Sequence, residues 1–286
     1  MTGGDQPASG VRRRLHHADS VDGPPAKGDR LSTFVLVHGA GAGGWIWKKV
    51  IPLLRAAGHE VYAPTLTGCG ERAHLNRGDI GLDTHVRDVV GTLVCEELAE
   101  VILVGHSYGG NVITGVADRA PDRLAQLVYL DANVPRDGES LVDLMGQEPQ
   151  IFRERAALRG AQWRHRNPAL PELPAAEAPP TAEGLTPWVA RGLLTAAERD
   201  WLLRHFGPHP AQTYLDPVRL RHPAALALPR AYIYCTLTGG PFATFAARAK
   251  VEPGWRYREL VSGHAAQVMA PRALADLLLG LRSPAT

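Results

Sequence analysis

Ser107 lies at the centre of a glycine-flanked pentapeptide, Gly-His-Ser-Tyr-Gly, at residues 105–109. This pattern is typical of a sharp turn between a strand and a helix that raises a serine hydroxyl above a sheet. The hydroxyl becomes a nucleophile when a histidine takes its proton, and a carboxylate normally orients that histidine. The motif therefore predicts acyl transfer through a covalent ester on Ser107. The alternative is a tight turn without a chemical role.

His264 is the candidate general base. It follows the last predicted strand, between Gly263 and Ala265. In α/β-hydrolases the serine, the acid and the histidine follow one another in this order along the chain, and the histidine comes late. Because the chain has 12 histidines, a solvent-facing loop histidine is the alternative interpretation.

A glycine-rich loop at residues 38–44 follows the first predicted strand. Its backbone can approach a substrate closely because few side chains stand in the way. We expect the backbone N–H groups of Ala40 and of Tyr108, the residue after the serine, to stabilise a developing oxyanion. A phosphate-binding loop is a weaker interpretation, since no Lys-Ser/Thr pair follows the glycines.

The elements that would position these residues alternate between strand and helix up to Asp131. This alternation predicts a parallel sheet with helices on both faces, and ligands bind such sheets at the carboxyl ends of the strands. Pro52 should bend or interrupt the first helix. The predicted strands are 33–37, 60–63, 101–104, 124–130, 231–235 and 257–260, and the main predicted helices are 45–57, 83–98, 111–118, 241–250 and 271–281.

The alternation stops after Asp131, which predicts a cap at residues 134–229 inserted into a core formed by residues 32–133 and 230–286. Caps shape the substrate pocket and exclude water. Three tryptophans of this segment would either line the pocket or form the cap's own core: Trp163, Trp188 and Trp201. The cap would contain helical segments at 141–145, 152–158 and 195–205, and a Pro- and Ala-rich stretch at 167–187.

Composition restricts the partners. Hydrophobic residues make up 45% and charged residues 21% of the 286 residues, the balance of an ordinary globular protein. The formal net charge is +2, from 31 basic and 29 acidic side chains. Nothing in this balance favours nucleic acid or an anionic membrane, and no apolar run is long enough for a membrane span. We expect a small-molecule substrate, and the sequence leaves a homodimer open.

Residues 1–31 are rich in Gly, Pro, Asp and Arg, which predicts a disordered tail, with a basic docking arm as the alternative. No apolar stretch follows the arginines at 12–14, so we expect no signal peptide. Cys69, Cys95 and Cys235 are far apart and do not have metal-ligand spacing. We therefore expect a reduced, cytoplasmic protein without a metal or an organic cofactor.

Three stretches resemble the plant methylesterase and hydroxynitrile lyase family and its bacterial relatives. They are His-Gly-Ala through Trp-Ile-Trp at 38–47, Gly-His-Glu-Val-Tyr-Ala-Pro at 58–64 and Gly-His-Ser-Tyr-Gly-Gly at 105–110. The resemblance implies an α/β-hydrolase fold with a six-stranded, mainly parallel sheet and a helical cap after the fourth strand. It also implies small ester or cyanohydrin substrates, with Ser107 and His264 as catalytic residues and Ala40 and Tyr108 as oxyanion donors.

Two positions separate the lyases from the esterases in this resemblance. Lyase members carry a threonine after the first-strand histidine and a lysine after the catalytic histidine, and the lysine supplies positive charge for departing cyanide. This chain has Gly39 and Ala265 at these positions. The sequence therefore favours the esterase.

The triad acid departs from the family pattern. The family places it in the loop after the fifth strand, but residues 235–241 of this chain contain no carboxylate. Asp131, at the end of the neighbouring fourth strand, is the nearest replacement, although it could instead be a loop cap. A Ser-His dyad is a further possibility. Weaker candidates for the acid are Asp137, Glu139 and Asp216.

The sequence thus predicts a carboxylic-ester hydrolase of the α/β-hydrolase fold, with Ser107 as nucleophile, His264 as base and Asp131 as its orienting acid. The missing acid after residue 235 motivates one alternative, a cofactor-free acyltransferase or cyclase that acts on an activated or carrier-bound acyl group. A non-catalytic binding protein that keeps the fold is the other alternative, and the intact Ser107 and His264 argue against it.

Overall fold

The computed structural model describes Met1, residues 31–166 and residues 180–281. Residues 2–30 of the predicted tail and residues 167–179 of the Pro- and Ala-rich stretch predicted at 167–187 therefore lie outside the described residues. Within the described ranges, no helix is both long and apolar enough to cross a membrane.

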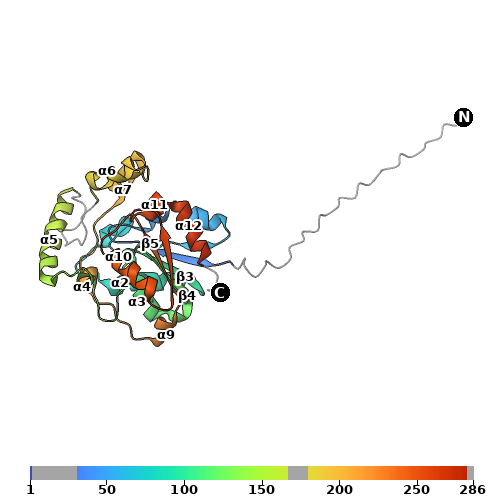
Figure 1. The fold of residues 1–286 in the computed structure, drawn as a ribbon, viewed down its shortest axis with the longest axis horizontal. Helices are drawn as coiled ribbons and strands as arrows, with labels where there is room; N and C mark the ends of the chain where they lie inside the picture. Colours follow the sequence, from blue (N-terminus) through green and yellow to red (C-terminus); the bar gives the residue numbers. More distant parts are fainter. Residues whose placement is uncertain (2–30, 167–179, 282–286) are drawn as a thin grey trace. The chain divides into compact units, whose positions relative to one another are not determined.

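One six-stranded sheet forms the centre of the unit from Leu31 onward (Figure 1). Its strand order is β2-β1-β3-β4-β5-β6, and every neighbouring pair is parallel. The six strands predicted from the sequence are confirmed. Their bounds are β1 Thr33–Val37, β2 Glu60–Tyr62, β3 Val101–His106, β4 Leu124–Leu130, β5 Arg230–Cys235 and β6 Trp255–Leu260.

Helices cover both faces of the sheet. The segments outside the β4–β5 connection are η1 Gly44–Trp47, α1 Ile51–Ala56, η2 Gly70–Leu75, α2 Leu82–Cys95, α3 Gly109–Arg119, η3 Pro121–Arg123, α10 Phe242–Val251, α11 Ala266–Met269 and α12 Pro271–Gly280, where η marks a short 3-10 helix.

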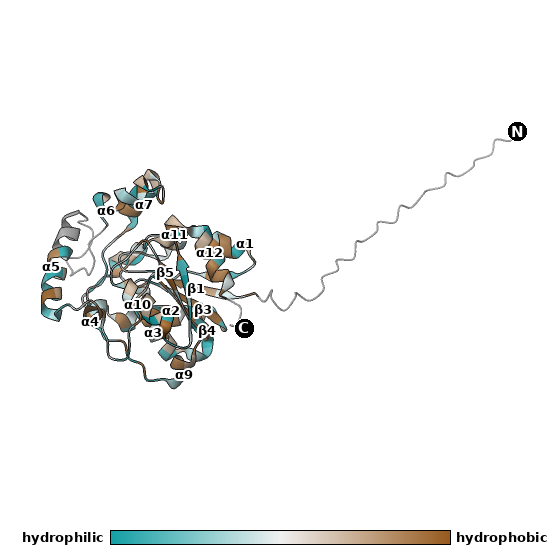
Figure 2. Cartoon of the chain, in the orientation of Figure 1, coloured by the Kyte–Doolittle hydropathy of each residue, from teal (hydrophilic) through white to brown (hydrophobic). Residues whose placement is uncertain are grey.

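Side-chain alternation along the strands creates two cores. In β1, Val35 and Val37 pack with α2 and α3 on one face, whereas Phe34 and Leu36 pack with η1, α1 and α12 on the other. Successive residues of a strand point to opposite faces, so a strand covered on both sides must be apolar throughout. This explains why continuous apolar runs marked the strands, and the apolar residues can be followed in Figure 2.

The helix predicted at 45–57 is wrong as one continuous element. The chain forms η1 first and begins α1 only at Ile51, with Pro52 in the first turn of α1. A proline has no N–H to donate, and the first turn of a helix is the place where that donor is not needed. The interruption expected at Pro52 is therefore present, and it lies just before the proline.

Within residues 131–166 and 180–229, the described parts of the β4–β5 connection, there are six helices, in the place where the cap was predicted. Two of them, α6 and α7, lie side by side (Figure 1). The prediction missed α6, which begins after Thr181, whose side chain accepts a hydrogen bond from the Gly184 N–H. The six are α4 Leu141–Leu144, α5 Pro149–Arg166, α6 Ala182–Ala190, α7 Ala196–His205, α8 Gln212–Leu215 and α9 Pro223–Ala227.

We predict that Gly110→Ala destabilises the fold by roughly 3 kcal/mol, because the added Cβ would overlap the carbonyl oxygen of Asn133. Gly91→Ala is the matched control in another helix, where nothing lies within 4 Å of an added Cβ. It should stabilise by about 0.5–1 kcal/mol through helix propensity. Urea unfolding of both variants and the parent provides the measurement. Equal effects of the two substitutions would contradict the prediction.

Candidate active site

Ser107 occupies the sharp turn between β3 and α3. Its backbone has φ 55°, in the left-handed region that residues other than glycine rarely adopt. Neighbouring backbone holds it there. The Ser107 N–H donates to the Leu130 carbonyl at 3.3 Å, and the Ser107 carbonyl accepts from Asn133 N–H at 3.2 Å. The end of β4 therefore fixes the serine in a strained conformation, which is common at active sites.

Two glycines allow other segments to approach this turn. A Cβ on Gly109 would lie 2.8 Å from the Val37 carbonyl oxygen, so α3 can begin against the end of β1 only with glycine at that position. A Cβ on Gly39 would lie 2.8 Å from the Ser107 Cβ. The loop after β1 thus passes directly beside the serine.

Asp131 and His264 are in direct contact. The Nδ1 of His264 lies 2.7 Å from Oδ2 of Asp131, and since a carboxylate can only accept, Nδ1 is the donor. The Asp131 side chain is fully buried, and its Oδ1 accepts from the Cys235 N–H at 3.2 Å. A buried carboxylate needs such partners for both oxygens. Asp131 therefore fixes the orientation and the tautomer of the His264 ring.

The other acidic candidates serve elsewhere. Asp216 accepts from the Leu82 N–H at the start of α2, at 2.8 Å. Asp137 accepts from the Leu220 N–H, and Glu139 from the backbone N–H of its near neighbour Arg136. Among the described residues, Asp131 is the carboxylate that reaches His264.

The His264 ring is also held from its sides. It stacks on Phe242, with ring centroids 4.6 Å apart, and packs against His106 at 4.5 Å. The Nε2 of His106 lies 2.9 Å from the His264 carbonyl oxygen. Burial keeps the pKa of His106 well below its usual range, so its neutral ring donates through Nε2 to that carbonyl. Phe242 and His106 thus position the ring that Asp131 orients.

Ala40 and Tyr108 line the same cavity as Ser107. No hydrogen-bond acceptor for the backbone N–H of either residue occurs in the described part of the chain. Two unpartnered N–H groups next to a nucleophile are the arrangement that an oxyanion hole requires.

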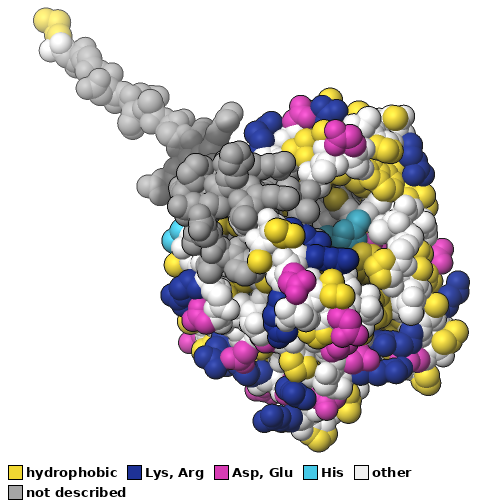
Figure 3. Space-filling model, turned by 90° about the vertical axis from the view of Figure 1, so that its left-hand side faces the viewer, with side chains coloured by type: hydrophobic (Ala, Val, Ile, Leu, Met, Phe, Trp, Pro, Cys, Tyr) yellow, Lys and Arg dark blue, Asp and Glu magenta, His cyan; other side chains and the backbone are white. Residues whose placement is uncertain are grey.

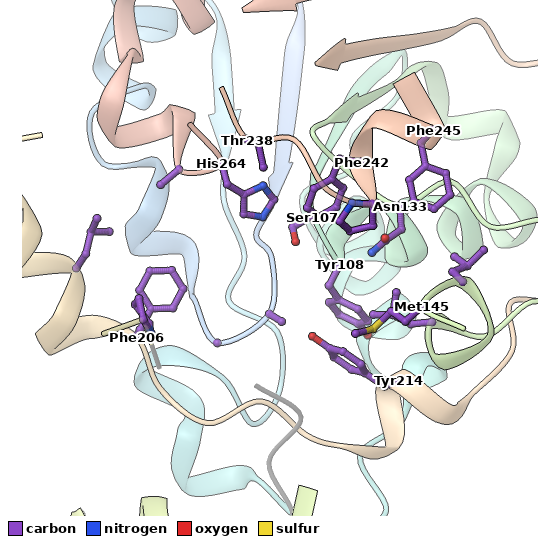
Figure 4. A pocket seen from close by; sticks show the side chains of 18 of the residues that line it. Ser107, Tyr108, Asn133, Met145, Phe206, Tyr214, Thr238, Phe242, Phe245 and His264 are labelled. Carbon is purple, nitrogen blue, oxygen red and sulfur yellow. The ribbon is translucent and has the colours of Figure 1, made fainter. Parts of the chain in front are cut away.

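The cavity has a volume of about 450 Å³, a size suited to a small molecule. Figure 4 shows Ser107 and His264 at its wall, facing a space bordered by aromatic side chains. On the face drawn in Figure 3, the surface has a hollow that holds a histidine, with hydrophobic side chains around it. None of the described lining residues is Lys, Arg, Asp or Glu. Apolar lining residues include Leu141, Met145, Leu185, Trp188, Phe206, Phe242, Phe245 and Met269.

The tryptophans of the β4–β5 connection have different places. Trp188 of α6 lines the cavity. Trp201 of α7 instead packs edge-on against Trp45 of η1, with ring centroids 5.0 Å apart. The side chain of Trp163 lies outside the described residues. Pocket lining therefore describes Trp188, whereas the contact of Trp201 with Trp45 lies outside the predicted cap, so a core of the cap's own does not describe it.

Comparison with known proteins decides the family. The model of the alpha/beta hydrolase family matches residues 34–277. The chain belongs to the alpha/beta hydrolase family.

Individual relatives agree with this family and with the resemblance seen in the sequence. The chain is 40% identical over 252 residues to a carbendazim hydrolyzing esterase of Nocardioides sp. (strain SG-4G), a match that covers 88% of this chain and 100% of that protein. It is 36% identical over 116 residues to methylesterase 8 of Arabidopsis thaliana, which covers 36% of this chain and 38% of that protein.

A solved structure of a hydrolase also superposes on this chain. The pyrethroid hydrolase from Sphingobium faniae JZ-2 superposes with a TM-score of 0.63 at 25% identity, over 88% of this chain and 97% of that chain. The predicted fold class and the predicted enzyme class, a carboxylic-ester hydrolase, are confirmed by these findings.

Sequence reasoning missed two residues of this hydrolase site, Asn133 and Phe242, which lie at the cavity beside Ser107 and His264. The sequence places both residues near the ends of predicted elements, since Asn133 follows the fourth strand and Phe242 lies at the start of the helix predicted at 241–250. No residue-type signal marked them, since an asparagine in a loop and a phenylalanine at a helix start are ordinary.

Two buried histidines lie beneath the site in fixed neutral forms. His85 donates from Nε2 to the Thr67 carbonyl at 2.8 Å and accepts at Nδ1 from the Tyr108 hydroxyl at 2.9 Å. His38 accepts at Nε2 from the Leu66 N–H and donates from Nδ1 to the Gly39 carbonyl. Burial lowers the pKa of both rings from 6.5 to about 4. His38 is thus a structural residue.

We predict that the free energy of unfolding decreases as the pH falls from 6.5 to 4. In this window the unfolded chain protonates histidines whose folded pKa is lower, so protons favour the unfolded state. Each buried histidine contributes on the order of 3 kcal/mol to the decrease. Urea unfolding across this pH range should give a flatter profile for His85→Gln than for the parent. The exposed His74→Gln is the control, and identical profiles for all three proteins would refute the role of His85.

Proposed function

We propose that this hydrolase cleaves small, uncharged carboxylic esters through a covalent ester on Ser107. The observation that carries the proposal is the 2.7 Å contact between Asp131 and His264 at the wall of the cavity that also holds Ser107. A histidine held by a buried carboxylate can take the proton that makes serine nucleophilic.

In the proposed reaction, Oγ of Ser107 attacks the ester carbonyl carbon, and its proton passes to Nε2 of His264. Asp131 stabilises the resulting imidazolium, and the N–H groups of Ala40 and Tyr108 donate to the oxyanion. The bond to the alcohol oxygen then breaks, and His264 returns the proton to that oxygen. Water attacks the acyl-enzyme by the same steps, which releases the acid and restores the Ser107 hydroxyl.

The cavity supports a small, neutral substrate. Its lining is largely apolar, and none of the described lining residues carries a side-chain amine, guanidinium or carboxylate that could pair with a charged ligand. The printed names of two similar proteins, a carbendazim hydrolyzing esterase and a pyrethroid hydrolase, supply the first compounds to test.

Transfer to an acceptor other than water is a weaker candidate. The reason to consider it was the missing carboxylate in the loop after β5, but the Cys235 N–H at the end of β5 donates to Asp131, which contacts His264. The site therefore does not need an activated acyl group to compensate for a lost acid. Turnover of p-nitrophenyl esters with and without an added amine or alcohol separates hydrolysis from transfer.

A cytoplasmic location stays a prediction.

We predict that a fluorophosphonate probe adds once to the parent protein and not to Ser107→Ala. The serine oxygen would displace fluoride from phosphorus while His264 takes the serine proton, so the adduct reports an activated hydroxyl. Intact-mass measurement detects the adduct, and hydrolysis of p-nitrophenyl acetate should be lost in the same variant. A parent without an adduct, or an equal adduct on Ser107→Ala, would remove the proposed mechanism.

We predict that Asp131→Asn lowers kcat by about 10⁴-fold, because the amide leaves the imidazole in the wrong tautomer and does not stabilise the imidazolium. Asp216→Asn is the matched control, since it is the same substitution at a carboxylate that binds the Leu82 N–H instead. It should retain kcat within about threefold. Steady-state kinetics on one p-nitrophenyl ester provides the measurement. Similar, small losses in both variants would indicate a Ser-His dyad.

A further inference from the structure

Asn133 presents an unpartnered amide to the cavity. It lies two residues after Asp131, lines the cavity beside Ser107 and Tyr108, and is only 6% exposed (Figure 4). No hydrogen bond of its side chain occurs within the described ranges, and its amide is not among the fully enclosed polar groups of those ranges that lack a partner. Because the amide faces the cavity, its partner must be whatever occupies the cavity.

The backbone of Asn133 is fixed to the nucleophile turn. Its N–H donates to the Ser107 carbonyl at 3.2 Å, and its own carbonyl oxygen occupies the space that a side chain on Gly110 would need. The Asn133 amide thus has a defined position relative to the Ser107 hydroxyl. A group that is rigid and close to the reacting atoms can position a substrate.

Two other polar groups of this wall already have partners, whereas the Thr238 hydroxyl, which lines the cavity near His264, has none within the described residues. The Tyr108 hydroxyl binds His85 at 2.9 Å, and the His264 ring is held by Asp131. Phe242 and Phe245 of α10 line the cavity near Asn133 and offer no hydrogen-bonding group (Figure 4). An uncharged amide that can donate and accept is suited to an uncharged polar group, such as a hydroxyl, and not to an ion.

We propose that the Asn133 amide hydrogen-bonds an uncharged polar group of the substrate that lies within a few bonds of the scissile ester. Asn133 is therefore a specificity residue, and the enzyme prefers esters that carry such a group over hydrocarbon esters of the same shape. This inference rests on the proposed ester hydrolysis at Ser107. It adds a hydrogen-bonding requirement to the selection for size and low polarity that the largely apolar lining imposes.

Three pairs of esters that differ only by hydroxyl in place of methyl test the inference. On the acyl side they are p-nitrophenyl lactate with p-nitrophenyl isobutyrate, and p-nitrophenyl β-hydroxybutyrate with p-nitrophenyl β-methylbutyrate. On the alcohol side, the pair is 2-hydroxypropyl benzoate with isobutyl benzoate. For each protein the measured quantity is the kcat/KM of the hydroxyl ester divided by the kcat/KM of the methyl ester of the same pair. Intrinsic ester reactivity cancels when the ratio of a variant is divided by that of the parent.

We predict that Asn133→Leu, which has nearly the same volume, lowers this ratio about tenfold for at least one pair, the loss expected for one hydrogen bond. Asn133→Ala should lower it likewise and serves if the leucine variant does not fold. Asn111→Leu is the matched control, because the Asn111 amide is buried, has no hydrogen-bond partner among the described residues and does not line the cavity. Its ratios should equal those of the parent.

The outcomes separate the two proposals. If the parent hydrolyses the esters and the Asn133 variants leave all three ratios unchanged, the role of Asn133 is refuted while the proposed hydrolysis stands. The same holds if Asn111→Leu lowers the ratios equally, since the effect would then be structural. If the parent hydrolyses none of the esters, the proposed function fails, and the inference fails with it.

Discussion

The buried carboxylate of Asp131 imposes the main constraint on this molecule. A charge that has no contact with solvent is tolerated only when hydrogen bonds satisfy both oxygens. Here one partner comes from the end of β5, the Cys235 N–H, and the other from the loop after β6, the His264 ring. Three strand ends must therefore meet at one point. The parallel sheet accomplishes this, because the backbone pairing of β4, β5 and β6 sets their relative positions along the whole edge.

The same edge holds the two strained residues of the site. Ser107 and Asp131 both have positive φ, 55° and 42°, and each directly follows a strand. The Asp131 N–H donates to the Ile233 carbonyl at 2.8 Å, and the Ser107 N–H to the Leu130 carbonyl, so each strained residue is tied to the neighbouring strand. Such conformations cost of order 1–3 kcal/mol each and persist only where the surroundings determine them. Hydrogen bonds to neighbouring strands thus stabilise the strained backbone at which the Ser107 and Asp131 side chains leave the regular strand direction.

The sequence predicts those parts of the structure that depend on local pattern. Apolar runs marked β1, β3, β4 and β5, and the Gly-x-Ser-x-Gly motif predicted the turn at Ser107. Asp131 could be suggested only because strands that follow one another in such folds are often neighbours in the sheet. Whether it faces His264 depends on side chains 133 residues apart. The roles of Asp216 and Asn133 were beyond reach for the same reason, since contacts between distant segments determine them. Helix α6 was missed because Pro187 and its alanine-rich surroundings resemble a loop, whereas the Thr181 cap starts a helix there.

The helices between β4 and β5 are coupled to the catalytic machinery through the loop after β1. The Gly207 N–H, just beyond α7, donates to the Gly41 carbonyl at 2.7 Å, next to the proposed oxyanion donor Ala40. Glu198 of α7 caps its own helix and forms an ion pair with Lys49, which follows η1. Because the segment that shapes the cavity also contacts the loop beside Ser107, a change in the packing of α7 acts on the oxyanion site as well as on the substrate space. In the proposed mechanism, substrate selection and transition-state stabilisation are therefore coupled, because the Gly207 N–H just beyond α7 binds the Gly41 carbonyl next to Ala40.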